Sequence, residues 1–334
     1  MADSTLTAIR TKVRRLVRAP SIQTLPDATL DEYINTFVLY DFPENLRLFS
    51  LRRTFTFYTS AYVDTYETTT TDSDDPMYQF KDRYITVHDP VYVAGYQAQF
   101  SQSREQFFGI WPFFNSIQLI ATGDGIVTLY TGTLNPVPIL RNNVTFSSID
   151  TNNNGIAIAD LPTTNTTGNL IIKTGAGLGN TVGTINYVTG AYTITFIEVP
   201  GAGQAINAET VPYSPSRPLS VLYFNNVFTC RPVPDESYPV NVEVYVRPTE
   251  LLAADQSPEL QQWWQYIAYG SAKKIFEDRT DMDSVQLIMP AFKEQETLVL
   301  RTTLVQQGDS RAATIYSQQT GLGAAPWGFG TGWW

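Results

Sequence analysis

The chain has 334 residues and a formal net charge of −10, with 32 acidic against 22 basic side chains. This acidic excess argues against a protein that grips nucleic acid through a basic surface, although it would suit a channel wall along which DNA must slide without sticking. The length suits two domains, or one domain with a large insertion. Charged residues make up only 16%, and the Thr, Asn, Gly, Tyr and Phe that replace them favour strands, uncharged turns and interfaces.

The first 40 residues are predicted to form two helices. Residues 3–18 carry apolar side chains every three or four positions, which is the spacing of one helical face. A second helix with the same spacing is expected from about 29 to 40. The remaining face of the first helix carries five basic side chains, Arg10, Lys12, Arg14, Arg15 and Arg18.

Strands are expected from residue 53 onward, where apolar residues begin to alternate with polar ones. Short strands are also predicted at 84–87, 91–93 and 117–120. Residues 121–210 differ, because they contain few charges and have Gly, Asn and Thr turns at short spacing. Many short strands with regular turns are typical of a sandwich or barrel, so we interpret 121–210 as an inserted all-β domain.

The first pattern resumes after this insertion and ends in two predicted helices. A strand over 239–246 has alternating valines. The first closing helix is expected to begin at Ser257, with Pro258 as its first residue. The second is expected from about Asp283 through Gln306. One partly apolar side of this second helix is predicted to carry Leu287, Ala291, Glu294, Leu298, Thr302 and Val305.

Together these elements predict an α+β fold with a helical and β core, an inserted sandwich-like domain and an extended C-terminal tail. The expected division is 1–120 for the first part of the core, 121–210 for the insertion, 211–306 for the second part of the core and 307–334 for the tail. The end of the tail, GLGAAPWGFGTGWW, is Gly-rich and carries four aromatic residues, Trp327, Phe329, Trp333 and Trp334.

Three motifs follow one another along the chain: a basic helix with a short second helix, a proline-bracketed pair of strands, and a closing helix pair. They read IRTKVRRLVRAPS…LPDATLDEYINTFVLYDFP, FTCRPVPDESYPVNVEVYVRPTELL and WWQYIAYGSAKKIFEDRTDMDSVQLIMPAFKEQETLVL. In this order they resemble the head-to-tail connector proteins of tailed bacteriophages (adaptor, head-completion or ring proteins). The resemblance covers everything but the insertion and the tail. Within the insertion, GTINYVTGAYTITFIEVPGAGQAINAE resembles a β-module that recurs in phage tail and baseplate proteins.

The resemblance implies a structural virion protein at the head-tail junction, made in the host cytoplasm. It implies a homo-oligomeric ring, commonly dodecameric, between the portal protein and a downstream tail or nozzle protein, with fibres as a further candidate partner. Double-stranded DNA would pass through the ring without specific binding. Two alternatives remain open: a tail-tube, baseplate or fibre-attachment protein, and a glycan-binding module. The absence of a run of about 18 apolar residues argues against a membrane role, and the first residues lack the apolar segment of a secretory signal.

The residues that could carry catalysis are few, so we expect neither an enzyme nor a cofactor. His88 is the only histidine and would be the base of any Ser-His-Asp triad. Its neighbour Asp89 should point to the other face of a strand, and a polar turn before Pro90 is the favoured interpretation. Cys230 is the only cysteine, which excludes an intrachain disulfide, and it is predicted to be buried.

Residues 150–161 imitate a calcium-binding loop without completing it. Asp150, Asn152 and Asn154 stand at the first, third and fifth positions, but the twelfth position, where a bidentate glutamate is needed, is Leu161. We therefore interpret this segment as an Asn-Gly turn and predict no metal site.

Two segments are candidates for docking partners. The basic stripe of the first helix would dock onto an acidic partner such as the portal rim, or contact DNA phosphate; its alternative is a solvated helix face. Of the two functional interpretations, the overall acidity of the chain favours docking onto a partner over contact with DNA phosphate. The aromatic side chains of the tail cannot form a core by themselves, so we expect grooves of a neighbouring subunit to bury them. A disordered end is the alternative.

Overall fold

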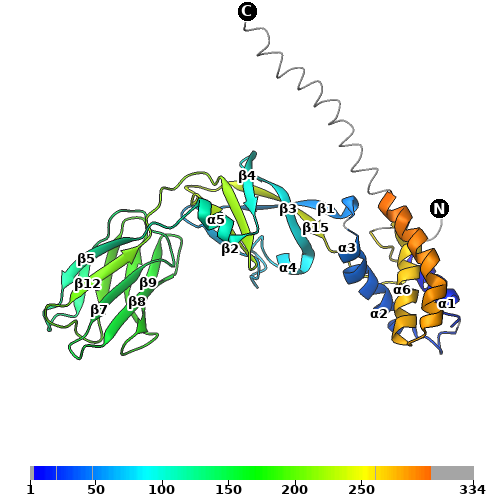
Figure 1. Cartoon of the computed structure of the whole chain (residues 1–334), viewed down its shortest axis with the longest axis horizontal. Coiled ribbons are helices and arrows are strands. Elements are labelled where there is room, and N and C mark those ends of the chain that lie inside the picture. The colour runs from blue at the N-terminus through cyan, green and yellow to red at the C-terminus, as the bar shows by residue number, and fades with distance from the viewer. Residues whose placement is uncertain (1–3, 20, 47, 260, 302–334) are drawn as a thin grey trace, which may run out of the picture. The chain divides into compact units, whose positions relative to one another are not determined.

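The computed structural model describes residues 4–19, 21–46, 48–259 and 261–301. The chain divides into two compact units (Figure 1). Of the described residues, unit 1 contains those within 4–53, 82–86 and 244–301, and unit 2 contains 54–81 and 87–243. The fold is α+β, as predicted, and most of its regular structure is β. Among the described residues, no helix is both long and apolar enough to cross a membrane.

Unit 1 contains most of the described helices. They are α1 (Leu6–Leu16), α2 (Asp27–Thr36), the π-helix η1 (Phe37–Asp41), α3 (Phe42–Asn45), the 3-10 helices η2 (Phe49–Leu51) and η3 (Gln261–Trp263), α6 (Trp264–Asp278), and a last helix over 282–301. The predicted apolar face of the first helix is confirmed, since Leu6, Ile9 and Val13 are fully buried. The helix predicted to reach residue 40 changes at Phe37 from α to π.

Two details of the closing helices were predicted wrongly. The first α-helix begins at Trp264, after a 3-10 turn, and not at Ser257. In the second, Leu287 and Leu298 are 78% and 45% exposed. The side chains that face the core are instead Val285, Ile288, Phe292 and Val299. Thr302 and Val305 lie outside the described residues.

The aromatic core of unit 1 explains which face of the last helix is buried. Phe292 stacks on Tyr266 with ring centroids 5.0 Å apart, and Phe37 meets Tyr266 edge-on at 5.4 Å. Gly270 in α6 makes room for this cluster, because a Cβ there would lie 2.1 Å from the Phe37 ring. Packing against these rings sets the orientation of the last helix, and this orientation leaves Leu287 and Leu298 exposed.

A mixed sheet of seven strands has the order β1-β15-β3-β4-β13-β14-β2. These strands are β1 (Arg52–Tyr58), β2 (Thr65–Glu67), β3 (Tyr84–Val93), β4 (Tyr96–Ser101), β13 (Ser220–Phe224), β14 (Val227–Arg231) and β15 (Pro239–Val246). The alternation predicted for β15 is confirmed, since Val240, Val242 and Val244 are fully buried. The short strands predicted at 84–87 and 91–93 form the single strand β3.

An antiparallel sheet of eight strands follows the order β5-β12-β7-β8-β9-β10-β11-β6. Its strands are β5 (Ser116–Thr122), β6 (Leu129–Thr133), β7 (Thr145–Ile149), β8 (Gly155–Pro162), β9 (Thr167–Thr174), β10 (Thr181–Asn186), β11 (Ala191–Thr195) and β12 (Ala205–Thr210). The sheet curls on itself, because Phe146 of β7 reaches Tyr192 of β11 with ring centroids 5.2 Å apart. The boundary expected at residue 121 falls inside β5.

The eight-stranded sheet occupies a single connection of the other sheet. Strands β4 and β13 are parallel neighbours, and the chain between them forms α5 (Arg104–Ile110) and then β5 to β12. A parallel pair always needs a long crossover, so this connection can accept a large insertion without breaking the pairing. The small helix α4 (Phe80–Arg83) completes the described elements.

Candidate functional site

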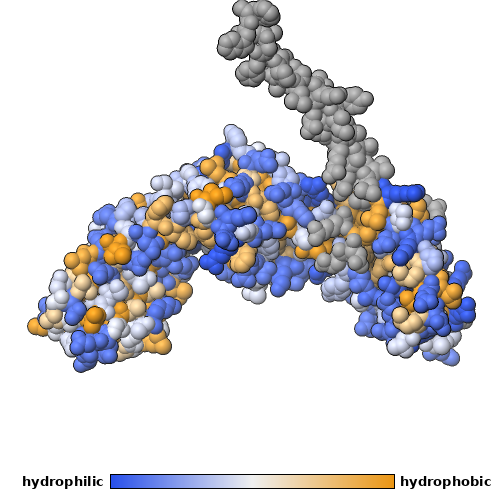
Figure 2. All heavy atoms as spheres, viewed as in Figure 1, coloured by the Kyte–Doolittle hydropathy of each residue, from blue (hydrophilic) through white to orange (hydrophobic). Residues whose placement is uncertain are grey.

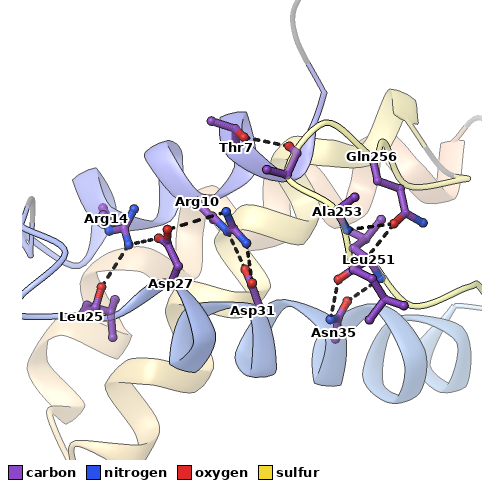
Figure 3. A network of polar contacts seen from close by, with 12 residues as sticks. Thr7, Arg10, Arg14, Leu25, Asp27, Asp31, Asn35, Leu251, Ala253 and Gln256 are labelled. Carbon is purple, nitrogen blue, oxygen red and sulfur yellow. Dashed lines mark hydrogen bonds and ion pairs between the residues drawn. The ribbon is translucent and has the colours of Figure 1, made fainter.

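The basic face of α1 is largely used inside unit 1. Arg10 donates from Nε to Oδ1 of Asp31 at 2.6 Å and lies 3.8 Å from Asp27, as Figure 3 shows. Arg14 forms an ion pair with Asp27 and donates to the carbonyl oxygen of Leu25 at 3.0 Å. The bond from Arg14 lowers the pKa of the Asp27 carboxyl. These two arginines therefore join α1 to the segment that carries α2.

A second link to α2 comes from the chain after β15. The buried amide of Asn35 donates to the carbonyl of Leu251 at 3.0 Å and accepts from the Leu251 N–H at 2.9 Å (Figure 3). This reciprocal pair satisfies two backbone groups that no regular element would satisfy. The loop after β15 is thereby held against α2.

The other three basic residues differ in their surroundings. Lys12 lies 5.4 Å from the centroid of the Tyr269 ring. Arg15 and Arg18 are exposed, and Arg18 lies in the turn after the helix with a φ of 54°. Docking by this stripe stays a prediction, and Arg15 and Arg18 are the residues with most surface to offer a partner. The tail residues Trp327, Phe329, Trp333 and Trp334 lie outside the described residues.

His88 lies in the middle of β3 and not in the predicted turn. With Asp89, Ser101 and Ser220 it lines a cavity of about 590 Å³ between β3, β4 and α5. The Ser101 hydroxyl donates to the carbonyl oxygen of Ser103 at 3.0 Å, so its proton is already engaged. The Ser101 proton is therefore directed at the backbone and not at His88.

The segment that imitates a calcium loop is a tight turn between β7 and β8. The Asp150 carboxylate accepts from the backbone N–H groups of Asn152 and Asn154, both at 2.7 Å, and from the Asn154 side chain at 2.9 Å. These bonds, led by the one from the Asn154 side chain, lower the pKa of Asp150. Asp160 instead accepts from the Tyr187 hydroxyl at 2.7 Å inside the β-domain. The two carboxylates thus have separate structural roles, and the turn interpretation is confirmed.

The remaining candidate for chemistry is Cys230, which lies fully buried in β14, as predicted. Burial raises the pKa of its thiol to about 12, which makes it a poor nucleophile. Over the described residues, no group of three or more His, Cys, Asp or Glu side chains is arranged to hold a metal ion.

Unit 2 contains a groove of about 580 Å³ that is rich in aromatic and proline residues. We call it the aromatic–proline groove. It is lined by three stretches of chain, namely Ile110, Trp111, Pro112, Phe113 and Phe114; Pro136, Val137 and Leu140; and Val211, Pro212, Tyr213, Ser214, Arg231, Pro232 and Val233. Mostly apolar linings with few polar groups are typical of binding sites.

One charged side chain occurs among the described residues of the groove lining, and an ion pair with a buried carboxylate neutralises it. Arg231 donates to Asp64 at 2.8 Å, and both side chains are under a tenth exposed. The guanidinium also donates to the Cys230 carbonyl at 3.2 Å and lies 5.5 Å from the centroid of the Phe113 ring. The groove therefore offers its ligand apolar and aromatic surface, and Arg231 serves to support one wall.

Strand β5, which begins two residues after the groove residue Phe114, carries exposed apolar side chains. It is an end strand of the eight-stranded sheet, and its Ile117 and Leu119 are 71% and 59% exposed. No charged residue occurs between Glu105 and Asp124. Natural sheets commonly protect an edge with charges, so the uncharged edge indicates a contact surface. Figure 2 shows apolar residues exposed on the eight-stranded sheet, which lies at the left in the view of Figure 1.

Sequence reasoning did not find this groove. The stretch Ile110 to Phe114 carried one usable signal, which was four aromatic or proline residues in a row without a charge. The other two stretches lie far away in sequence, so only the fold brings them to the same place. No known family model matches the sequence, and no curated protein is significantly similar to it.

Proposed function

We propose that this chain is a non-enzymatic structural subunit of a phage particle, which forms a ring at the head-tail junction and attaches the tail. The observation that carries the proposal is the uncharged apolar surface formed by the aromatic–proline groove and β5. A monomer rarely exposes contiguous apolar surface of this kind unless a partner covers it. The kind of assembly is proposed from the order of the three sequence motifs, which resembles the order in head-to-tail connector proteins.

The proposed mechanism is geometric. Copies of the chain surround the DNA exit channel, and the net charge of −10 repels phosphate, so that DNA passes without being held. Arg15 and Arg18 dock on an acidic surface of the portal protein, where salt would weaken the contact. The aromatic tail fastens the subunit to its neighbours.

The test is co-sedimentation of the purified chain with DNA-filled, tail-less heads of the phage that encodes it. Full-length protein is compared with the double variant Arg15→Glu/Arg18→Glu, and Lys81→Glu serves as a matched charge change away from α1. Full-length protein and the Lys81 variant should pellet with heads, and the double variant should remain in the supernatant. Failure of full-length protein to bind heads would overturn the proposal.

A second candidate is a tail-tube, baseplate or fibre-attachment protein. It is favoured by the size of the eight-stranded sheet, which takes up residues 116–210 of the chain. In that case the full-length protein should pellet with isolated tails and not with heads. The same centrifugation with purified tails therefore distinguishes the two candidates.

A further inference from the structure

We propose that the aromatic–proline groove is the receptor for the aromatic C-terminal segment, residues 320–334, of a second copy of this chain. The inference rests on the proposed function in one respect, since it assumes that copies lie next to each other in the assembly. It adds the site at which they are joined and the segment that joins them.

The chemistry of the groove selects an uncharged ligand. Among the described residues that line it, only Arg231 is charged, and Asp64 already neutralises it at 2.8 Å. An acidic or basic peptide would lose its hydration there without gaining a partner. The chain itself supplies a suitable ligand, because residues 312–334 contain no charged side chain and include five aromatic residues, four of them within 320–334.

The exposure of the groove suits a peptide laid along it. Phe114 is 75% exposed, Ile110 is 53% exposed and Val137 is 38% exposed. Shortly after Phe114 in the chain, β5 also exposes Ile117 and Leu119. Aromatic and proline side chains at the wall of an open groove recognise extended segments that present rings or prolines. The segment GAAPWGFGTGWW offers both, and its glycines permit close approach of the backbone.

The length of the chain makes exchange between copies possible. Arg301 is the last described residue, and Trp327 follows 26 residues later. At roughly 3.3–3.6 Å per residue, that distance can reach about 85–95 Å. A segment donated to the next copy gives a head-to-tail contact, which is the type that propagates around a closed ring. A segment folded back on its own copy would saturate the groove and join nothing.

Photo-cross-linking of the full chain tests the proposal. Phe329 is replaced by p-benzoylphenylalanine, and equal amounts of isotopically heavy and light protein are mixed, irradiated and digested. Mass spectrometry should find heavy tail peptides joined to light peptides that contain residues 110–114, 136–140 or 211–214. Cross-links only within one copy, or only to surfaces outside the groove, would overturn it.

Two matched substitutions show whether the groove itself is responsible. Phe114→Asp places a carboxylate in the groove, and Leu178→Asp places one on an equally exposed apolar residue of a β-domain loop, since these side chains are 75% and 70% exposed. The first should reduce the cross-link yield by about tenfold or more, and the second by less than about twofold. Circular dichroism checks that both remain folded.

Equal yields from the two variants would refute the groove as the receptor. This result is separate from the test of the proposed function, whose readout is pelleting with heads through α1. A chain that binds heads but gives no cross-link to the groove keeps the connector proposal and loses this one. A chain that gives the cross-link but binds neither heads nor tails keeps the groove contact and loses the connector role.

Discussion

Removal of the Asp64 carboxylate should destabilise unit 2 strongly. Asp64 pairs with Arg231 at 2.8 Å, and the two side chains are only 8% and 9% exposed. Arginine keeps its charge in any protein environment, so Asp64→Leu leaves a buried cation without a partner. Breaking one half of a buried pair costs about 3–5 kcal/mol. Because Arg231 supports the Phe113 wall, the aromatic–proline groove should loosen as well.

The double variant Asp64→Leu/Arg231→Met separates the worth of the pair from the cost of a stranded charge. Replacing both partners by apolar residues of similar size is often neutral or stabilising, so the double variant should lie within about 1–2 kcal/mol of the unaltered protein. A matched control is Glu277→Gln in α6, which breaks the more exposed Lys273–Glu277 pair at 3.4 Å. It should cost no more than about 0.5 kcal/mol.

Hydrogen exchange of the β13 and β14 amides measures these free energies within unit 2, where a global melting curve would mix both units. The slowest amides report the opening that exposes the pair. A cost of Asp64→Leu below about 1 kcal/mol would refute the reasoning, because the pair would then be hydrated in solution and not buried. A double variant as unstable as the single one would place the cost in packing and not in charge.

Three further predictions follow from single residues. Gly270→Ala should lower the free energy of unfolding by about 1–3 kcal/mol, since its Cβ would meet a buried phenylalanine ring at 2.1 Å. The control Gly109→Ala, whose Cβ would have nothing within 4 Å, should be neutral or stabilising. Urea titration measures both free energies of unfolding. Arg14 lowers the pKa of Asp27 from 3.8, so their pair stabilises the fold above pH 3.8 and this stabilisation is lost as the pH falls through the lowered pKa. When the free energy of unfolding is measured during acid titration, Asp27→Asn should make its decline shallower. Burial raises the pKa of the Cys230 thiol from 9.0 to about 12, so the thiol should react with a thiol reagent at about pH 8 only after urea unfolds the protein. The contribution of the buried, neutral thiol to stability should be lost as the pH rises from about 9 to about 12.

Much of the local structure could be predicted from the pattern of apolar residues. The helical spacing of Leu6, Ile9 and Val13 and the alternation along β15 were both borne out. The turn at Asp150 and the burial of Cys230 were also predicted correctly. These features depend on neighbours within a few residues, so the chain order alone contains the relevant contacts.

Other features failed because their partners lie far away in sequence. The pattern selected Leu287 and Leu298 for the buried face of the last helix, but the position of Tyr266 selected the face that carries Phe292. It placed a turn at His88, where pairing with neighbouring strands maintains one continuous strand. The basic stripe of α1 was judged as a surface, but the acidic residues of α2 had already engaged part of it.

The sequence by itself determined the α+β composition, the acidic balance and the uncharged run around Phe113, because these properties follow from residue identity and short-range order. Only the tertiary structure decided that this run meets Pro136, Tyr213 and Arg231 in one groove. The physical reason is that a binding surface is made by long-range contacts, and the crossover between β4 and β13 brings these distant segments together.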